Sequence, residues 1–179
     1  MRPFSAALPT LAAALLAGTA LVVPVPASAG GYIALDGSAV TLGEGFDDEL
    51  NPRGGRLRLG LRISNLFDVE VQAGLSSERD AAPFDSVDVA WGGAYLKGYL
   101  PVGERSALFA LGGVAGVDIT QSIGEGEFSD ERGGFSFGAG LETGLSERLD
   151  ISADWMRYVD GEGAFESVDA VSLGLKLYF

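Results

Sequence analysis

The sequence predicts an all-β fold, an eight-stranded antiparallel up-and-down β-barrel that crosses a lipid bilayer. Three observations lead to this prediction. Residues 171–179 alternate apolar and polar side chains and end on Phe179, which is the pattern of a strand with one apolar face. Seven further segments alternate in the same way, and the connections between them are short and long in turn. A closed barrel in lipid explains these patterns, because lipid covers the apolar face and closure leaves no free edge.

The first 29 residues are expected to form a cleavable signal peptide ahead of the barrel. Arg2 is the only early charge, and an apolar run follows over residues 6–25. Small residues at positions 27–29 give a cleavage pattern, so Gly30 is the expected first mature residue. The run is long enough for a permanent spanning helix, but its prolines and the cleavage pattern disfavour that alternative. We therefore expect a signal peptide over residues 1–29 and an outer-membrane barrel over residues 30–179.

The composition excludes several kinds of chemistry. The chain has no cysteine and no histidine, so it lacks a thiol nucleophile, a thiolate metal site and the commonest general base. The net charge of −13 argues against nucleic acid as a partner. Glu142 and Asp154 could in principle act as an acid and base pair, but no nucleophile supports them. We expect no enzymatic activity, no cofactor and no metal site.

The eight segments are each long enough to cross a membrane as tilted strands. The alternating stretches cover approximately residues 31–41, 56–63, 67–75, 86–100, 109–119, 135–145, 149–155 and 171–179. Tight turns are expected at residues 64–66, 101–105 and 146–148, and longer polar connections at about residues 42–55, 76–85, 121–133 and 160–166. Short turns face the periplasm in outer-membrane barrels, so both ends of the mature chain are expected there.

The register of two hairpins follows from the apolar pattern. Pairing Leu61 with Val69 on the lipid side places Arg62 opposite Asp68 on the inside. The hairpin around residues 146–148 also keeps one face apolar. Because a slip by one residue would turn every side chain to the opposite face, this pattern predicts the register of both hairpins.

The faces of two strands remain open at this stage. If Trp91 and Tyr95 belong to an aromatic girdle at the lipid surface, Lys97 also points toward lipid, unless a bulge near the neighbouring glycines turns it inward. Arg157, which follows Trp155, raises the same question.

Charged side chains are expected to fill the interior of the barrel. The predicted lumen network consists of Arg56, Arg58, Arg62, Asp68, Glu70, Glu142, Asp154 and Lys176, with Asp88, Asp118 and Asp150 as further interior carboxylates. Eight strands leave an interior just wide enough for side chains, which favours a packed network of paired charges. The alternative is an ion pathway with a charged constriction, as in a small porin-like channel or passive transporter.

The longer connections concentrate acidic residues, for example Asp47–Glu49 and Glu125–Glu131. Clustered carboxylates suit calcium or magnesium, but the run Asp47–Glu49 lacks the spacing of a known calcium loop. We interpret the acidic connections as solvated surface, with diffuse cation bridging to anionic lipopolysaccharide as a softer form of metal binding.

Four stretches carry a resemblance to a known family: Tyr95–Pro101, Leu108–Gly113, Asp154–Tyr158 and Leu177–Phe179. They resemble the small outer-membrane β-barrel superfamily that includes the transmembrane domain of outer membrane protein A and the opacity proteins. The resemblance implies eight antiparallel strands and insertion by the outer-membrane barrel assembly machinery. It also implies that this machinery recognises the terminal strand, with Phe179, Leu177 and Leu175 as the assembly signal. The chain stops at Phe179, so no periplasmic peptidoglycan-binding domain is expected.

Together these features predict an integral protein of the bacterial outer membrane with a packed, charged lumen and acidic extracellular loops. Its expected role is structural or one of surface interaction, such as adhesion. The expected partners are outer-membrane lipid, lipopolysaccharide and the barrel assembly machinery, and the expected oligomeric state is a monomer.

Deletion of Phe179 is expected to impair outer-membrane assembly more than truncation of any one acidic connection. The terminal strand is both lipid-facing wall and assembly signal in this interpretation, whereas the connections lie outside the membrane. The measurement is the amount of folded barrel in outer-membrane fractions, detected by its heat-dependent migration on gels. Normal assembly of both variants would contradict the role assigned to the terminus.

Overall fold

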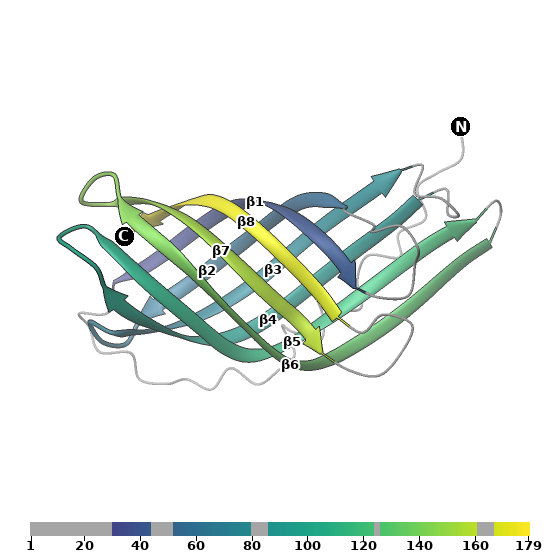
Figure 1. The fold of residues 1–179 in the computed structure, drawn as a ribbon, viewed down its shortest axis with the longest axis horizontal. Coiled ribbons are helices and arrows are strands. Elements are labelled where there is room, and N and C mark those ends of the chain that lie inside the picture. Colours follow the sequence, from purple (N-terminus) through teal and green to yellow (C-terminus); the bar gives the residue numbers. More distant parts are fainter. Residues whose placement is uncertain (1–29, 44–51, 80–85, 124–125, 161–166) are drawn as a thin grey trace.

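Eight strands close into a single antiparallel barrel (Figure 1). The computed structural model describes residues 30–43, 52–79, 86–123, 126–160 and 167–179, so the predicted signal peptide lies outside the described residues. The strands are β1 (Gly31–Gly43), β2 (Arg53–Arg62), β3 (Phe67–Arg79), β4 (Ser86–Pro101), β5 (Ser106–Ile123), β6 (Gly126–Gly144), β7 (Leu149–Asp160) and β8 (Ser167–Tyr178). Across these ranges, no helix is long and apolar enough to cross a membrane.

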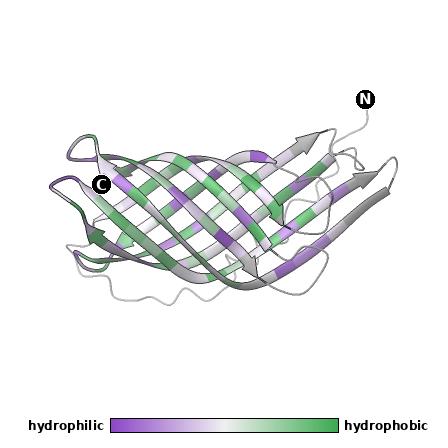
Figure 2. Ribbon diagram, viewed as in Figure 1, coloured by the Kyte–Doolittle hydropathy of each residue, from purple (hydrophilic) through white to green (hydrophobic). Residues whose placement is uncertain are grey.

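The period-two pattern separates an outer face from an inner face on every strand. On β8, Val171, Leu173, Leu175 and Leu177 are between 48% and 61% exposed. Lys176 on the opposite face is fully buried. Figure 2 shows hydrophobic positions repeating along the strands around the broad part of the barrel. Apolar side chains on the outside and polar side chains on the inside require an apolar surrounding, which a bilayer provides.

The first and last strands join to close the barrel. β1 pairs with β8 in antiparallel register, with Ile33 opposite Leu177. The Gly31 amide donates to the Phe179 carbonyl at 3.2 Å, and the Phe179 amide donates to the Gly31 carbonyl at 3.0 Å. The Phe179 ring lies so close to Gly31 that a Cβ on this glycine would be 2.8 Å from a ring carbon. The terminal strand is therefore a structural part of the barrel wall.

The predicted register of the first hairpin is confirmed. β2 and β3 place Leu61 opposite Val69 and Arg62 opposite Asp68. The turn after β6 is also as predicted, because the Leu145 amide donates to the Leu149 carbonyl at 2.8 Å.

The predicted connection over residues 121–133 is wrong in extent, because most of it is strand. β5 and β6 are 18 and 19 residues long and pair in unbroken register from Ser106 opposite Thr143 to Ile123 opposite Gly126. The connections predicted at 42–55 and 76–85 are likewise shorter than expected, since β1, β2 and β3 extend into them. Outside the membrane a strand does not need an apolar outer face, so the alternation fades and the sequence resembles a loop.

The structure shows that Lys97 of β4 faces the lumen and not the lipid. Trp91, Tyr95 and Lys97 are all buried in the barrel interior, and β4 pairs with both neighbours without a register shift. Trp91 and Tyr95 therefore do not belong to an aromatic girdle, and Lys97 faces the lumen without a bulge. On β5 the apolar residues Val117 and Ile119 also point inward.

Two predicted lumen residues consequently lie outside. Asp88 on β4 and Asp118 on β5 alternate with these buried residues and face outward. The sequence pattern showed which residues share a face. It did not show which face points inward, because β4 and β5 carry large apolar side chains on the lumen face, whereas the other strands carry them on the lipid face.

Two adjacent glycines of β5 provide a test of the assigned faces. A Cβ on Gly113 would lie 2.0 Å from the carbonyl oxygen of Ala94, whereas the nearest atom to a Cβ on Gly112 is a Phe135 ring carbon at 3.9 Å. Gly113→Ala should lower the free energy of unfolding by about 1–3 kcal/mol through overpacking. Gly112→Ala should leave it within about 0.5 kcal/mol of the parent. Urea unfolding in lipid vesicles measures both, and equal effects would contradict the register of β4 and β5.

Candidate functional site

The barrel interior consists of two layers of different chemistry. We call the end that carries the turns at residues 63–66, 102–105 and 145–148 the turn end, and the opposite end the loop end. Near the turn end the lumen is filled by buried charged residues: Asp36, Arg56, Arg58, Asp68, Glu70, Lys97, Glu142, Asp154 and Lys176. Near the loop end it is filled by apolar residues that are at most 4% exposed: Val40, Leu42, Val87, Val89, Val117, Ile119, Met156, Val168 and Ala170.

Asp36 on β1 holds together the part of the charged layer nearer the loop end. Its carboxylate accepts from Arg56 Nε at 2.8 Å and from Arg58 Nε and Nη2, each at 2.7 Å. Arg56 also forms an ion pair with Asp154 on β7 through Nη2. One carboxylate is thus shared by two neighbouring guanidinium groups of β2, which connects β1, β2 and β7 across the lumen.

Glu142 on β6 holds together the part of the charged layer nearer the turn end. Its Oε2 accepts from Lys97 Nζ at 3.0 Å and from Lys176 Nζ at 2.8 Å. Glu70 on β3 links the two parts, because its Oε2 lies 3.7 Å from Arg58 Nη1 and 3.9 Å from Lys97 Nζ. Apart from Asp68, which accepts from the Tyr99 hydroxyl, the charged layer is therefore one continuous chain of ion pairs.

Aromatic side chains complete the charged layer. Lys97 Nζ lies 3.8 Å from the centre of the Phe109 ring of β5, and Lys176 Nζ lies 4.3 Å from the centre of the Tyr32 ring. The Tyr32 hydroxyl donates to Glu70, and the Tyr99 hydroxyl donates to a buried carboxylate, that of Asp68. Ring faces stabilise cations that have lost their water, so each ammonium group is surrounded by carboxylate and ring.

The charges in this layer nearly balance. Four buried cations face five buried carboxylates. At the turn end Arg62, whose side chain is 42% exposed, lies 3.6 Å from Asp68. Also at that end, Asp150 accepts from the Tyr178 hydroxyl at 3.0 Å. Within the described ranges, no group of three or more acidic side chains is arranged to hold a metal ion.

The structure brings all eight predicted network residues into one lumen and adds two that the prediction left out of the network. Asp36 lies in a strand with a weak pattern, and the orientation of Lys97 was open. Arg157 faces outward on β7 next to a bulge and pairs with Asp169 of β8, with Nε to Oδ1 at 2.9 Å. Asp36 could have been found from its position opposite Arg56, had the β1–β2 register been known.

A second candidate site lies outside the lumen, where β3 to β6 extend past the other strands at the loop end (Figure 1). We call residues 86–90 of β4, 116–123 of β5 and 126–133 of β6 the projecting sheet. Its outer face carries Asp88, Asp118 and Glu131, and Asp118 is directly opposite Glu131. Among the described outward-facing residues of this sheet there is no Lys or Arg.

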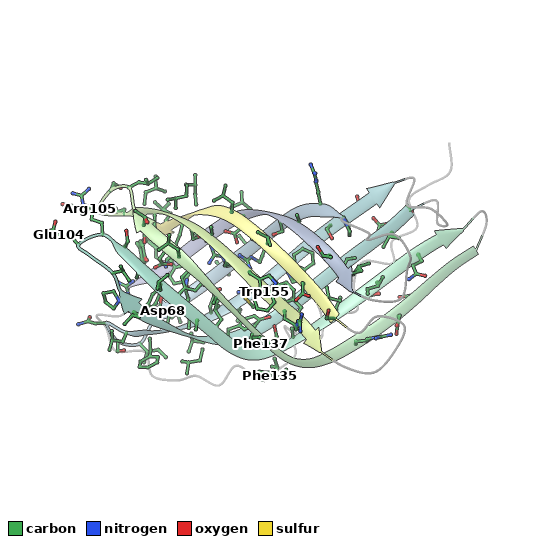
Figure 3. All side chains as sticks on the ribbon, in the orientation of Figure 1. Asp68, Glu104, Arg105, Phe135, Phe137 and Trp155 are labelled. Carbon is green, nitrogen blue, oxygen red and sulfur yellow. The ribbon has the colours of Figure 1, made fainter. Side chains whose placement is uncertain are left out.

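An aromatic patch lies on the outer face next to the projecting sheet. Phe135, Phe137 and Trp155 gather on β6 and β7 (Figure 3). The ring centres of Phe135 and Phe137 are 6.1 Å apart, and those of Phe137 and Trp155 are 5.8 Å apart. Aromatic residues concentrate where barrel strands leave the membrane, so this patch indicates the membrane boundary at the loop end.

Solved structures share this fold at low sequence identity. Ail, the attachment invasion locus protein of Yersinia pestis, is 17% identical with a TM-score of 0.65, covering 84% of this chain and 99% of Ail. Neisserial surface protein A is 14% identical with a TM-score of 0.70, covering 83% of this chain and 97% of that chain. A de novo designed transmembrane β-barrel is 12% identical with a TM-score of 0.51, covering 84% and 95%. No curated protein sequence matches the chain.

A family model decides the classification. The model described as the outer membrane protein beta-barrel domain matches residues 10–179, which include all eight strands. The exposed apolar belt and the closed antiparallel register are features that a barrel of this kind requires. The chain therefore belongs to the outer membrane protein beta-barrel family and is a protein of the bacterial outer membrane.

Proposed function

We propose that the protein is a non-conducting and non-catalytic barrel that holds an acidic sheet at the cell surface for interaction with other molecules. The observation that carries the proposal is the filled lumen. Short turns of outer-membrane barrels face the periplasm, so the turn end is placed there and the projecting sheet extends outside the cell.

The two layers of the lumen argue against an ion pathway. Ion pairs and tyrosine hydroxyls occupy the turn end, and nine apolar side chains that are almost completely buried occupy the loop end. An apolar constriction excludes water and ions even where it is not sterically closed. An ion would have to displace paired charges and then cross an apolar layer, so the small-channel alternative has the weaker support.

The chemistry of the charged layer argues against catalysis. Each of the five buried carboxylates lies within 4 Å of a cationic group. A general base needs access to a substrate proton, and these groups face one another instead. The network therefore supports a structural role, in which it fixes the register of strands around the barrel.

The projecting sheet supports the surface role. It offers an acidic outer face beyond the membrane boundary that the aromatic patch indicates. Ail is called an attachment invasion locus protein and its counterpart from Neisseria a surface protein. A designed barrel shares the fold as well, so the fold alone does not specify a role. The proposed surface role therefore rests on the projecting sheet.

Two further interactions belong to this proposal. Outer-membrane lipid and lipopolysaccharide would surround the apolar belt of a single barrel. The assembly machinery would recognise the strand that ends with Leu175, Leu177 and Phe179, whose apolar side chains are exposed on the outer face.

Single cysteines test the closed lumen, since the natural chain contains none. Ser38, between the two layers, is 5% exposed, and Ser77 lies on the outer face of β3. In the folded protein, Ser77→Cys should react rapidly with a charged, membrane-impermeant thiol reagent. Ser38→Cys should react at least a hundredfold more slowly, because water does not reach it. Similar rates, or steady conductance of the parent protein in planar bilayers, would favour the channel instead.

Arg56→Leu tests the structural role of the network. It should lower the free energy of unfolding by about 3–5 kcal/mol, because it leaves buried carboxylates without their partner. Adding Asp154→Leu should restore part of this loss, since it removes the uncompensated charge. The matched control is Arg157→Leu in the partly exposed pair with Asp169, which should cost about 0–1 kcal/mol. Equal costs in urea unfolding would contradict the role of the buried layer.

A further inference from the structure

We propose that the free edge of β6 in the projecting sheet binds an extended, basic peptide segment of a partner protein by strand addition. The inference rests on the proposed surface role and names the class of partner that the sheet would take. It goes beyond the general acidity of the sheet, because it assigns both the hydrogen-bonding groups and the side chains that would recognise the peptide.

The edge exists because β7 separates from β6 before β6 ends. Their pairing extends from Gly144 opposite Asp150 only as far as Phe137 opposite Arg157. At this point the Ser136 hydroxyl donates to the Arg157 carbonyl at 2.7 Å. Beyond it, among the described residues, β6 continues with β5 as its only strand neighbour.

The register shows which backbone groups the edge offers. The Gly144 amide donates to the Arg105 carbonyl on the β5 side, and the Leu145 amide donates toward β7. The β5–β6 ladder has no register shift, so even-numbered residues of β6 bond to β5 and odd-numbered residues point to the other side. The amides and carbonyls of Glu131, Gly133 and Phe135 therefore face the open edge. Within the described ranges no strand pairs with these groups, and such a row of amides and carbonyls is a template for another strand.

The side chains along the edge define the chemistry of the peptide. Glu131 faces Asp118 across the hairpin, and like charges placed directly opposite destabilise a sheet. Asp88 adds a third carboxylate on β4, the neighbour of β5, because Ala90, two residues along the same face, pairs with Asp118. A Lys or Arg from an added strand would relieve this repulsion, which gives charge complementarity for a basic segment.

The two ends of the edge differ, which gives the peptide a direction. Phe135, at the membrane end, is 64% exposed and offers an apolar contact. Gly133 between Phe135 and Glu131 has no side chain, so a side chain of the added strand has room there. On the outer face, the expected partner segment therefore carries a basic residue beside Glu131 and an apolar residue beside Phe135, nearest the membrane.

Charge also disfavours a second copy of the chain as the occupant. Edge-to-edge pairing of two barrels would bring the carboxylates of a second outer face alongside Asp88, Asp118 and Glu131. Charged residues on an edge protect proteins against such self-association.

The test uses the full-length chain folded in phosphatidylcholine nanodiscs and three labelled nine-residue peptides. One alternates lysine with valine, one alternates lysine with proline, and one alternates glutamate with valine. The lysine–proline peptide keeps the charge but cannot form a β ladder, because proline lacks the amide hydrogen. Fluorescence anisotropy should show binding of the lysine–valine peptide at least tenfold tighter than that of the other two.

Two variants separate backbone pairing from charge. Gly133→Pro removes one edge amide and leaves the bonds to β5 intact, so it should weaken binding of the lysine–valine peptide at least fivefold. Glu131→Lys should weaken it as strongly and should create binding of the glutamate–valine peptide. Heat-dependent gel migration of each variant verifies that the barrel is folded.

Each other outcome overturns the inference. Equal binding of the two lysine peptides, unaffected by Gly133→Pro, would mean simple charge attraction without strand addition. Capture of lipopolysaccharide that requires calcium and is lost in Glu131→Lys, without peptide binding, would assign the acidic face to lipid. Absence of all binding would refute the peptide site, whereas the closed lumen is judged separately by the rate of thiol labelling.

Discussion

Lipid offers no hydrogen bonds, and this constraint determines the architecture of the protein. Every backbone amide and carbonyl at membrane depth must find a partner within the chain, which is possible for strands only when the sheet closes. Closure by pairing of β1 with β8 then divides each strand into an outer and an inner face. The outer face has to be apolar, and the inward-facing side chains have to fill a narrow lumen.

The filling of the lumen reflects this division. In the part of the barrel near the turns, the interior residues are charged and must be paired, because an isolated charge there would be very unfavourable. Asp36 and Glu142 each serve two cations. The pairs of Glu142 with Lys97 of β4 and Lys176 of β8 link strands that are not neighbours in the sheet, as does the pair of Arg56 with Asp154. Such pairs contribute little net stability compared with apolar packing. Their main effect is that a shifted register would leave several charges without partners.

The sequence pattern was sufficient for those parts of the fold where lipid imposes a rule. The strand count, the β2–β3 register and the outer face of β8 all follow from apolar residues at every second position. The pattern failed on β4 and β5, because Trp91 and Val117 fill the lumen with the same apolar character that other strands show to lipid. It also failed beyond the membrane, where Asp118 and Glu131 belong to a long hairpin that lipid does not constrain. The lumen charges could be identified, but their partners depend on contacts across the barrel that only the closed register reveals.

The seam between β1 and β8 has a consequence for the order of folding. Its partners, such as Ile33 and Leu177, come from opposite ends of the barrel sequence, so their pairing has the largest loop entropy to overcome. The hairpins can form early from local contacts, whereas the seam forms after them. Until then both outermost strands present unpaired edges, and the hydrogen bond between Ser38 of β1 and Ser172 of β8 is not made. The vulnerable period of this protein is therefore the interval before closure, and its length depends on how fast two distant strands meet.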